Sequence, residues 1–213
     1  MLFRQILDPA TASLSYLLAD DSSADAVVID PLPATALLVR SILQEQGLNL
    51  RYVLRTHVHA PDRIECGALC RLPGVCYAVG DFAAAPSAQR RLADGDVVQF
   101  GGERLRVMAT PGHTPGCVSY LWRDRVFCGD VMEINGCGQA VDETDFGQMY
   151  DSVMHRIFAL ADETLLFPAH DYRGRTVSTI AEERRMNSAF LGRSRDAFVT
   201  AMQAWPGNRL HAA

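Results

Sequence analysis

Short apolar runs alternate with amphipathic segments along the first third of the chain. The runs are bounded by Asp, Pro and Ser, as strands commonly are. Between Leu37 and Leu43 apolar residues recur on one face at helical spacing, and Gly47 ends that pattern. Together these patterns predict strands over 3–7, 15–18, 26–29, 52–55 and 75–79, and helices over 34–46 and 64–72.

The centre of the chain has mainly strand-like patterns, and the last third returns to alternating helix and strand. Gly-Gly, Pro-Gly and Arg-Asp turns separate the central strands. We expect strands over 97–100, 105–109, 118–122, 126–128 and 165–167, and helices over 150–160, 179–185 and 195–205. Strands and helices therefore alternate in two halves, which predicts an α/β fold of sheets sandwiched between helices, in one domain over 1–213.

Composition narrows the class of protein further. The 213 residues carry a formal net charge of -5, which argues against a nucleic-acid partner. We find no apolar run long enough for a membrane span and no secretory signal pattern at the start. Cysteines in apolar or glycine-rich surroundings predict reduced packing residues and hence a cytoplasmic protein; they are Cys66, Cys70, Cys76, Cys117, Cys128 and Cys137.

Histidine and aspartate gather where predicted strands end. His57 and His59 follow the strand over 52–55, and His113 lies in a Pro-Gly-rich loop after the strand over 105–109. Asp130 and His170 follow the strands over 126–128 and 165–167. Such loops are where rigid scaffolds display catalytic groups. Neutral imidazoles and a carboxylate held at strand ends predict a metal site.

At these residues the chain resembles the metallo-β-lactamase superfamily, whose signature is T-H-x-H-x-D-H, a distant G-H-T-x-G, then G-D and a late histidine. It is more closely similar to the persulfide dioxygenases, over about residues 3–190. The matching segments are Phe3-Arg4-Gln5, Val28–Pro31, Thr110–Cys117, Gly136-Cys137-Gly138, Thr144-Asp145-Phe146, Pro168–Tyr172 and Thr176–Thr179 leading to Glu182-Glu183-Arg184.

The resemblance implies an αββα metallo-β-lactamase sandwich with one Fe(II) per chain. By position, the iron ligands fall on His57, His113 and Asp130. Two imidazoles and one carboxylate with open positions are also the facial arrangement of ferrous oxygenases. The implied reaction is oxidation of a small persulfide, such as glutathione persulfide, by O₂ to sulfite and thiol. A homodimer is implied as well.

The same resemblance implies roles for three further residues. His59 and His170 would be catalytic residues beside the metal that orient its ligands and a bound water. Tyr172 matches a tyrosine on the substrate side and would be catalytic and substrate-binding. His155 and His211 are interpreted as structural residues, one in a predicted helix and one in the C-terminal tail.

The chain departs from the superfamily pattern directly after His59. The run His59-Ala60-Pro61-Asp62-Arg63 has an inserted proline and then Asp-Arg where the pattern has Asp-His. Arginine cannot ligate a metal, because its guanidinium stays protonated. Arg63 would instead place a cation where a second metal would lie, which disfavours a dinuclear hydrolase.

A second departure lies in the region expected to bind substrate. Gln139-Ala140-Val141-Asp142-Glu143 separates Gly138 from Thr144, where the family has a single arginine. Gln139, Tyr172 and Arg173 are the residues expected to bind substrate, with Arg173 supplying the missing cation. The two added acids would repel the carboxylates of glutathione, so we expect a high KM for glutathione persulfide.

Two other functions stay open at this point. The first is a glyoxalase-II-like thioesterase that uses a metal-bound hydroxide, normally with the second metal site that this chain alters. The second is a degenerate, non-catalytic or sensing member of the fold. Oxygen consumption with a persulfide separates the dioxygenase from both, and thioester hydrolysis separates the two alternatives.

Overall fold

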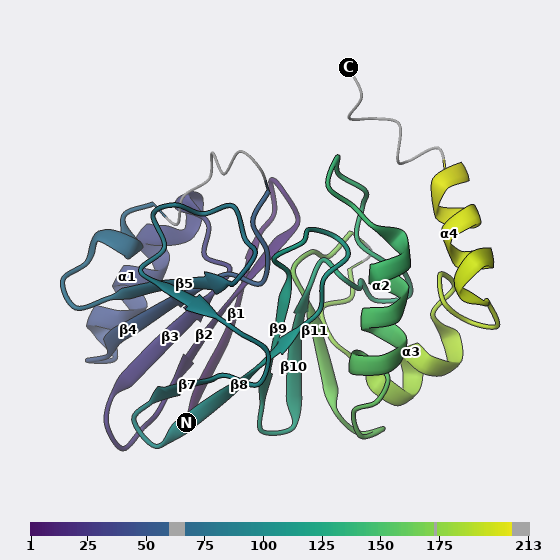
Figure 1. Cartoon of the computed structure of the whole chain (residues 1–213). Coiled ribbons are helices and arrows are strands. Elements are labelled where there is room, and N and C mark those ends of the chain that lie inside the picture. Colours follow the sequence, from purple (N-terminus) through teal and green to yellow (C-terminus); the bar gives the residue numbers. More distant parts are fainter. Residues whose placement is uncertain (60–66, 173, 206–213) are drawn as a thin grey trace.

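The computed structural model describes residues 1–59, 67–172 and 174–205, which form two six-stranded sheets flanked by helices (Figure 1). The first sheet has the order β1-β2-β3-β4-β5-β6. Its strands are β1 (Leu2–Asp8), β2 (Ser13–Ala19), β3 (Asp25–Ile29), β4 (Asn49–Leu54), β5 (Cys76–Gly80) and β6 (Arg90–Leu92).

The second sheet has the order β12-β11-β10-β9-β8-β7. Its strands are β7 (Val97–Phe100), β8 (Glu103–Ala109), β9 (Val118–Trp122), β10 (Arg125–Gly129), β11 (Leu165–Pro168) and β12 (Ser178–Thr179). The helices are α1 (Ala36–Glu45), α2 (Phe146–Ser152), α3 (Ile180–Met186) and α4 (Arg195–Ala204). Shorter helical segments are η1 (Pro33–Thr35), η2 (Leu69–Arg71) and the π-helical η3 (Val153–Ile157).

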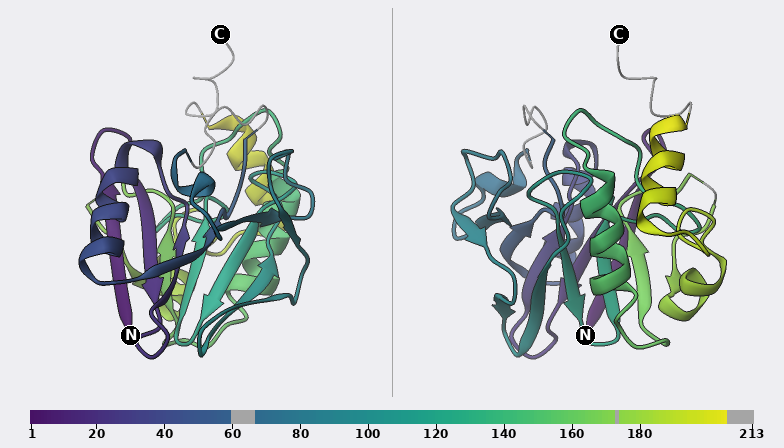
Figure 2. Two further views of the ribbon diagram at one scale, coloured as in Figure 1. Left: turned by 90° about the vertical axis from the view of Figure 1, so that its left-hand side faces the viewer. Right: turned by 45° about the vertical axis from the view of Figure 1, so that its right-hand side comes forward.

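Helices cover the outer face of each sheet, so the layers are helix, sheet, sheet and helix. Figures 1 and 2 show α1 against the first sheet and α2, α3 and α4 against the second. Three apolar cores fill the spaces between these layers. Strand β2 borders two of them: Leu14, Tyr16 and Leu18 face the other sheet, whereas Leu17 and Ala19 face α1. Strands buried on both faces explain the continuous apolar runs in the sequence.

Parallel pairing brings the strand exits together at one edge of each sheet. Strand β4 runs parallel to β3 and β5, and β10 runs parallel to β11. The carboxyl ends of parallel strands share an edge, where α/β sheets usually bind their ligands. The hydrogen bond from the Val118 N–H to the Thr56 carbonyl (2.8 Å) then ties β9 of one sheet to the exit of β4 in the other.

The expected strands and the sandwich are confirmed, with differences at short or irregular elements. Strands β6 and β12 were not predicted. They have three and two residues, which is too short to show an alternation of apolar and polar positions. The helix expected over 150–160 begins earlier, at Phe146, because the Asp145 side chain accepts a hydrogen bond from the Gln148 N–H and caps it. Within 64–72, residues 64–66 lie outside the described residues, and the helical part is only η2.

The cysteines divide into two groups. Cys76, Cys117, Cys128 and Cys137 are free, as expected. Cys70, in η2 on the outside of the first sheet, is disulfide-bonded, so the prediction of a reduced thiol is wrong for this residue. Because Cys70 is oxidised, the cysteines do not all indicate a reducing compartment.

Among the helices of the described residues, none has both the length and the apolar character required to cross a membrane.

Candidate metal centre

Four side chains that can ligate a metal converge where the two sheets meet. His57 and His59 follow β4, His113 lies between β8 and β9, and Asp130 follows β10. Each offers a ligand atom, and these four atoms lie within 4.8 Å of one another. The three imidazole rings are 4.9–5.1 Å apart between centroids and nearly perpendicular to one another. The sequence therefore predicted correctly which strand exits come together.

Asp130 uses its two carboxylate oxygens differently. Oδ1 lies 2.7 Å from Nδ1 of His170, within hydrogen-bond distance. Oδ2 faces the metal-binding side, 3.4 Å from Nε2 of His57 and 3.7 Å from Nε2 of His113. His170 thus orients the carboxylate, while Oδ2 and two imidazole nitrogens point at a common position. Hydrogen bonds of this kind orient the ligands of metal sites in general.

A hydrogen-bonded chain fixes the ring of His57 from behind. The Thr56 N–H donates to Oδ1 of Asp30 (2.8 Å), and the Thr56 hydroxyl donates to Oδ2 of the same carboxylate (2.7 Å). Because that hydroxyl proton is engaged, Thr56 Oγ1 accepts from Nδ1 of His57 at 2.9 Å. The proton of a neutral His57 ring is thereby held on Nδ1, and the Nε2 lone pair faces the site.

Burial and mutual charge set the protonation of the group. Burial lowers the pKa of His57 and of His113, so both imidazoles are neutral and able to donate a lone pair. Burial alone would raise the pKa of Asp130, but His57, His170 and His113 hold it well below its usual range. Burial would likewise lower the pKa of His170, yet its hydrogen bond to Asp130 raises it. The centre thus offers neutral imidazoles and an ionised carboxylate.

The donor set fits a metal ion. Nε2 of His113 is buried and has no hydrogen-bond partner within the described part of the chain. Leaving a buried polar atom unsatisfied costs on the order of 1–3 kcal/mol. A cation bound by His113, His57 and Asp130 Oδ2 would satisfy that nitrogen and offset the cost. His59 is more exposed, but its ring lies as close to the other two as they lie to each other.

Two glycines allow the close approach of the segments around Asp130. Gly129 has a φ of +62°, and a Cβ there would collide with the Thr56 side chain. A Cβ on Gly138 would collide with the backbone carbonyl of Asp130. Glycine is therefore required at both positions for steric reasons. The Gly-Cys-Gly motif thus serves to pack its segment against the backbone of a metal-binding residue.

The residues expected on the substrate side lie at different depths. Tyr172 is half-exposed, and its ring stacks on His170 at 5.3 Å with an interplanar angle of 5°. Burial raises the pKa of its phenol to about 12, so the hydroxyl stays protonated and can donate. The backbone of Gln139 lies beside the His113 ring, while its side chain is exposed. Arg63 and Arg173, for which roles were also expected, lie outside the described residues.

Cys117 lies beside the His113 loop but is not a candidate nucleophile. Its sulfur accepts a hydrogen bond from the Thr114 N–H (3.2 Å), and burial raises the pKa of its thiol to about 12. A thiol with this pKa is inert at neutral pH. This agrees with the interpretation of Cys117 as a packing residue.

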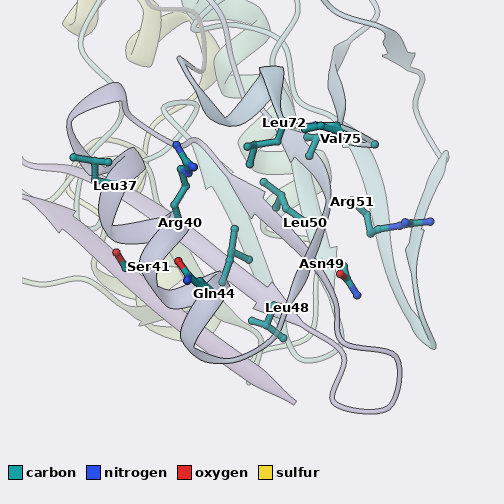
Figure 3. A pocket seen from close by; sticks show the side chains of 13 residues that line it. Leu37, Arg40, Ser41, Gln44, Leu48, Asn49, Leu50, Arg51, Leu72 and Val75 are labelled. Carbon is teal, nitrogen blue, oxygen red and sulfur yellow. The ribbon is translucent and has the colours of Figure 1, made fainter.

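A cavity of about 600 Å³ lies elsewhere, between α1, β4 and the segment that precedes β5 (Figure 3). Leu37, Leu48, Leu50 and Leu72 contribute apolar surface, with Arg40 among the polar side chains that surround them. Its lining contains no histidine, cysteine or acid. It therefore lacks the groups that metal or acid–base chemistry requires.

The chain has the metallo-β-lactamase fold. Its two buried sheets have helices on their outer faces, and a His-x-His, His and Asp group lies at the sheet edge. No protein-family model matches the chain. The persulfide dioxygenase ETHE1, mitochondrial, of Homo sapiens is 42% identical over 211 residues, which cover 95% of this chain and 80% of that protein. The chain belongs to the persulfide dioxygenase family, and it is an enzyme.

A solved structure and a more distant relative complete the comparison. The crystal structure of ETHE1 from Myxococcus xanthus superposes with a TM-score of 0.91 at 38% identity, covering 96% of this chain and 91% of that one. A hydroxyacylglutathione hydrolase from Photobacterium profundum is 36% identical over 159 residues, 73% of this chain and 60% of the hydrolase. Similarity to the dioxygenases is thus higher and extends over more of both chains.

Sequence reasoning did not assign a role to Asp30 or Thr56 in the metal centre. Both carried a signal in the sequence, because Asp30 directly follows β3 just as Asp130 directly follows β10, and Thr56 directly precedes His57. Asp30 also has a φ of +49°, which is uncommon for a residue with a side chain. That backbone conformation accompanies a carboxylate turned toward the exit of β4.

Proposed function

We propose that this enzyme oxidises a low-molecular-weight persulfide with O₂ at a single ferrous ion held by His57, His113 and Asp130. The observation that carries the proposal is the convergence of two neutral imidazoles with one oxygen of an ionised carboxylate. That donor set is typical of ferrous oxygenases. Membership in the persulfide dioxygenase family supports the substrate class.

The overall reaction balances with water as the third reactant. One persulfide, RSSH, reacts with O₂ and H₂O to give the thiol RSH, sulfite and two protons. The two sulfur atoms together lose four electrons and O₂ gains four: the S–S bond breaks, the terminal sulfur becomes sulfite, and the inner sulfur stays with R as the thiol. When bound, a ferrous ion would supply the redox chemistry and open coordination positions.

The protein contributes orientation and charge. His170 holds Oδ1 of Asp130 so that Oδ2 stays directed at the centre, and the Thr56 hydroxyl keeps the His57 lone pair on the same side. Tyr172 stacks on His170 and keeps a protonated phenol, which can donate to a sulfur or oxygen anion of a bound substrate. His59 lies beside the centre on its more exposed side and can hold a water or a proton there.

Oxygen uptake by the anaerobically purified, iron-loaded enzyme tests the proposal. We expect stoichiometric consumption of O₂ and formation of sulfite when glutathione persulfide or a smaller persulfide is added. Hydrolysis of S-lactoylglutathione without persulfide-dependent oxygen uptake would replace the dioxygenase with the thioesterase alternative. Absence of both activities in metal-loaded protein would favour the non-catalytic alternative.

We predict one metal ion per chain, with iron supporting activity. Two imidazoles and one carboxylate oxygen complete a single facial set, and Arg63 replaces a histidine of the superfamily pattern. Metal analysis of protein purified under anaerobic conditions should give about one equivalent. Two stoichiometric metals in fully active enzyme would contradict this count. Zinc displaces iron during overexpression when affinity favours it, so activity must be measured after reconstitution with Fe(II).

Assembly and location stay predictions. A homodimer follows from the resemblance alone, and sedimentation velocity of the iron-loaded protein would measure it. The cytoplasmic prediction rested partly on reduced cysteines, and Cys70 does not meet that expectation. The human relative is named as a mitochondrial protein.

A further inference from the structure

The cavity beside α1 is formed by three segments whose backbones are fixed by hydrogen bonds. One side of α1 contributes residues at helical spacing, namely Leu37, Arg40, Ser41 and Gln44. Where the chain turns from α1 into β4, the Leu48 N–H donates to the Leu43 carbonyl (2.8 Å). In the segment that leads into β5, the Val75 N–H donates to the Leu72 carbonyl (3.2 Å). The walls of this cavity of about 600 Å³ are therefore held in place.

The apolar part of the lining is aliphatic. Its leucines are Leu37, Leu43, Leu48, Leu50 and Leu72, and none of the described residues that line the cavity is aromatic. Leu37 is 75% exposed at the edge of the cavity, whereas Leu48 and Leu72 are partly buried against the core of the first sheet. A surface without a ring for stacking favours an aliphatic over an aromatic ligand. The volume is within the range of pockets that bind small organic molecules, about 300–1,000 Å³.

Arg40 gives this aliphatic surface a positive charge. No ion pair or hydrogen bond engages its guanidinium in the part of the chain that the structure describes. Arg51 also lines the cavity, but its Nε lies 3.6 Å from Oδ1 of Asp25, and Figure 3 shows its side chain directed away from the leucines. Glu45, the one acid of α1, is not among the lining residues. The cavity is thus complementary to an anionic group on an aliphatic chain.

We propose that this cavity is a binding site for a free medium-chain fatty acid, whose chain lies on the leucines and whose carboxylate pairs with Arg40. Burial of the chain supplies affinity, and the charge of Arg40 selects the carboxylate. The site is separate from the metal centre, because the cavity contacts the beginning of β4, whereas His57 follows the end of that strand. The proposal therefore does not depend on the persulfide reaction.

Anaerobic calorimetry of the iron-loaded protein tests the site with monomeric hexanoate, octanoate and decanoate. We expect one decanoate per chain and an affinity that rises by about fourfold for each CH₂ group that is fully buried. Decanol has the same chain without the charge. It should bind about fivefold more weakly than decanoate, the upper end for a partly exposed ion pair. Equal affinities for decanoate and decanol would overturn the role of Arg40.

Variants separate the head group from the chain. Arg40→Gln should weaken decanoate binding by about fivefold and leave decanol binding and persulfide-dependent oxygen uptake unchanged. Arg104→Gln makes the same change of net charge at an exposed arginine of β8, in the other sheet, and is the matched control without an effect. Leu72→Ala should weaken decanoate and decanol by the same factor. Decanoate binding that is lost from the metal-free protein would contradict the proposal, because the carboxylate would then bind iron.

Two other occupants of the cavity would give different results. A dimer that Leu37→Asp dissociates in sedimentation velocity, together with no binding of decanoate, would assign the leucines to a second copy of the chain. Binding to phosphatidylglycerol vesicles without binding of monomeric decanoate would assign them to a membrane surface. Either result would overturn the fatty-acid site.

Discussion

Alanine in place of His57, His113 or Asp130 is expected to remove nearly all bound iron and to reduce oxygen uptake by about three orders of magnitude or more. Each substitution leaves two of three proposed ligands, and the facial set requires all three. Asp130→Ala also removes the acceptor that orients His170. Iron content after anaerobic reconstitution and persulfide-dependent oxygen uptake measure the two effects. Asp130→Asn, which keeps the shape of the side chain, separates loss of charge from loss of packing.

The contrast with His59 and His170 makes this prediction specific. His59→Ala and His170→Ala should retain metal but weaken its binding or the activity by roughly 10–100-fold, as changes beside a metal site do. His155→Ala removes an exposed histidine of η3 and is the matched control without an effect on iron. If His59→Ala empties the site as completely as His57→Ala, then His59 is a ligand. Its ring lies close enough for that outcome.

The sequence predicted the elements whose signal is local and repeated. Strand β2 could be predicted because its residues, buried on both faces, form a continuous apolar run in the sequence. Helix α1 could be predicted because its apolar residues recur at helical spacing. The ligand candidates were readable because His57, His113 and Asp130 each follow a predicted strand. Parallel strands end at a common edge, so position at a strand exit already implies proximity there.

Features that depend on contacts between distant segments were not readable. The hydrogen bond of His170 to Asp130 joins residues 40 apart in sequence. The hydrogen bond from the Thr144 hydroxyl to the backbone carbonyl of His113 joins residues 31 apart in sequence and seats the 141–144 turn on the His113 loop. In both cases a single sequence gives residue types, whereas tertiary packing gives their partners.

The support of His57 by Asp30 through Thr56 is such a contact, and the structure gives it a measurable consequence. Thr56 is almost fully buried, and its hydroxyl lies between the carboxylate of Asp30 and Nδ1 of His57. Burial raises the pKa of Asp30, while the positive charge of Arg55 and the hydrogen bonds from Thr56 oppose that rise. Removal of the hydroxyl therefore affects both the carboxylate and the imidazole.

Thr56→Val is accordingly expected to weaken iron binding by about 10–100-fold while the protein stays folded. Valine preserves the shape of threonine, but His57 Nδ1 loses the acceptor that keeps the Nε2 lone pair toward the metal. Thr110→Val is the matched control, since Thr110 is equally buried and, among the described residues, its hydroxyl bonds only to that of Ser119, at 2.9 Å. Thr56→Val loses two buried hydrogen bonds and Thr110→Val loses one, so both variants are expected to lose stability, by about 1–3 kcal/mol for each buried group left without a partner.

Competition with a chelator measures the iron affinity of both variants, and thermal unfolding of the metal-free proteins measures their stability. Asp30→Asn should weaken iron binding in the same direction as Thr56→Val. The double variant should lose less affinity than the two single losses added together, because both residues act on His57 through one hydroxyl. Equal iron affinity in Thr56→Val and Thr110→Val would show that the ring of His57 is held by packing alone. Additive losses in the double variant would show that Asp30 and Thr56 act on the metal centre separately.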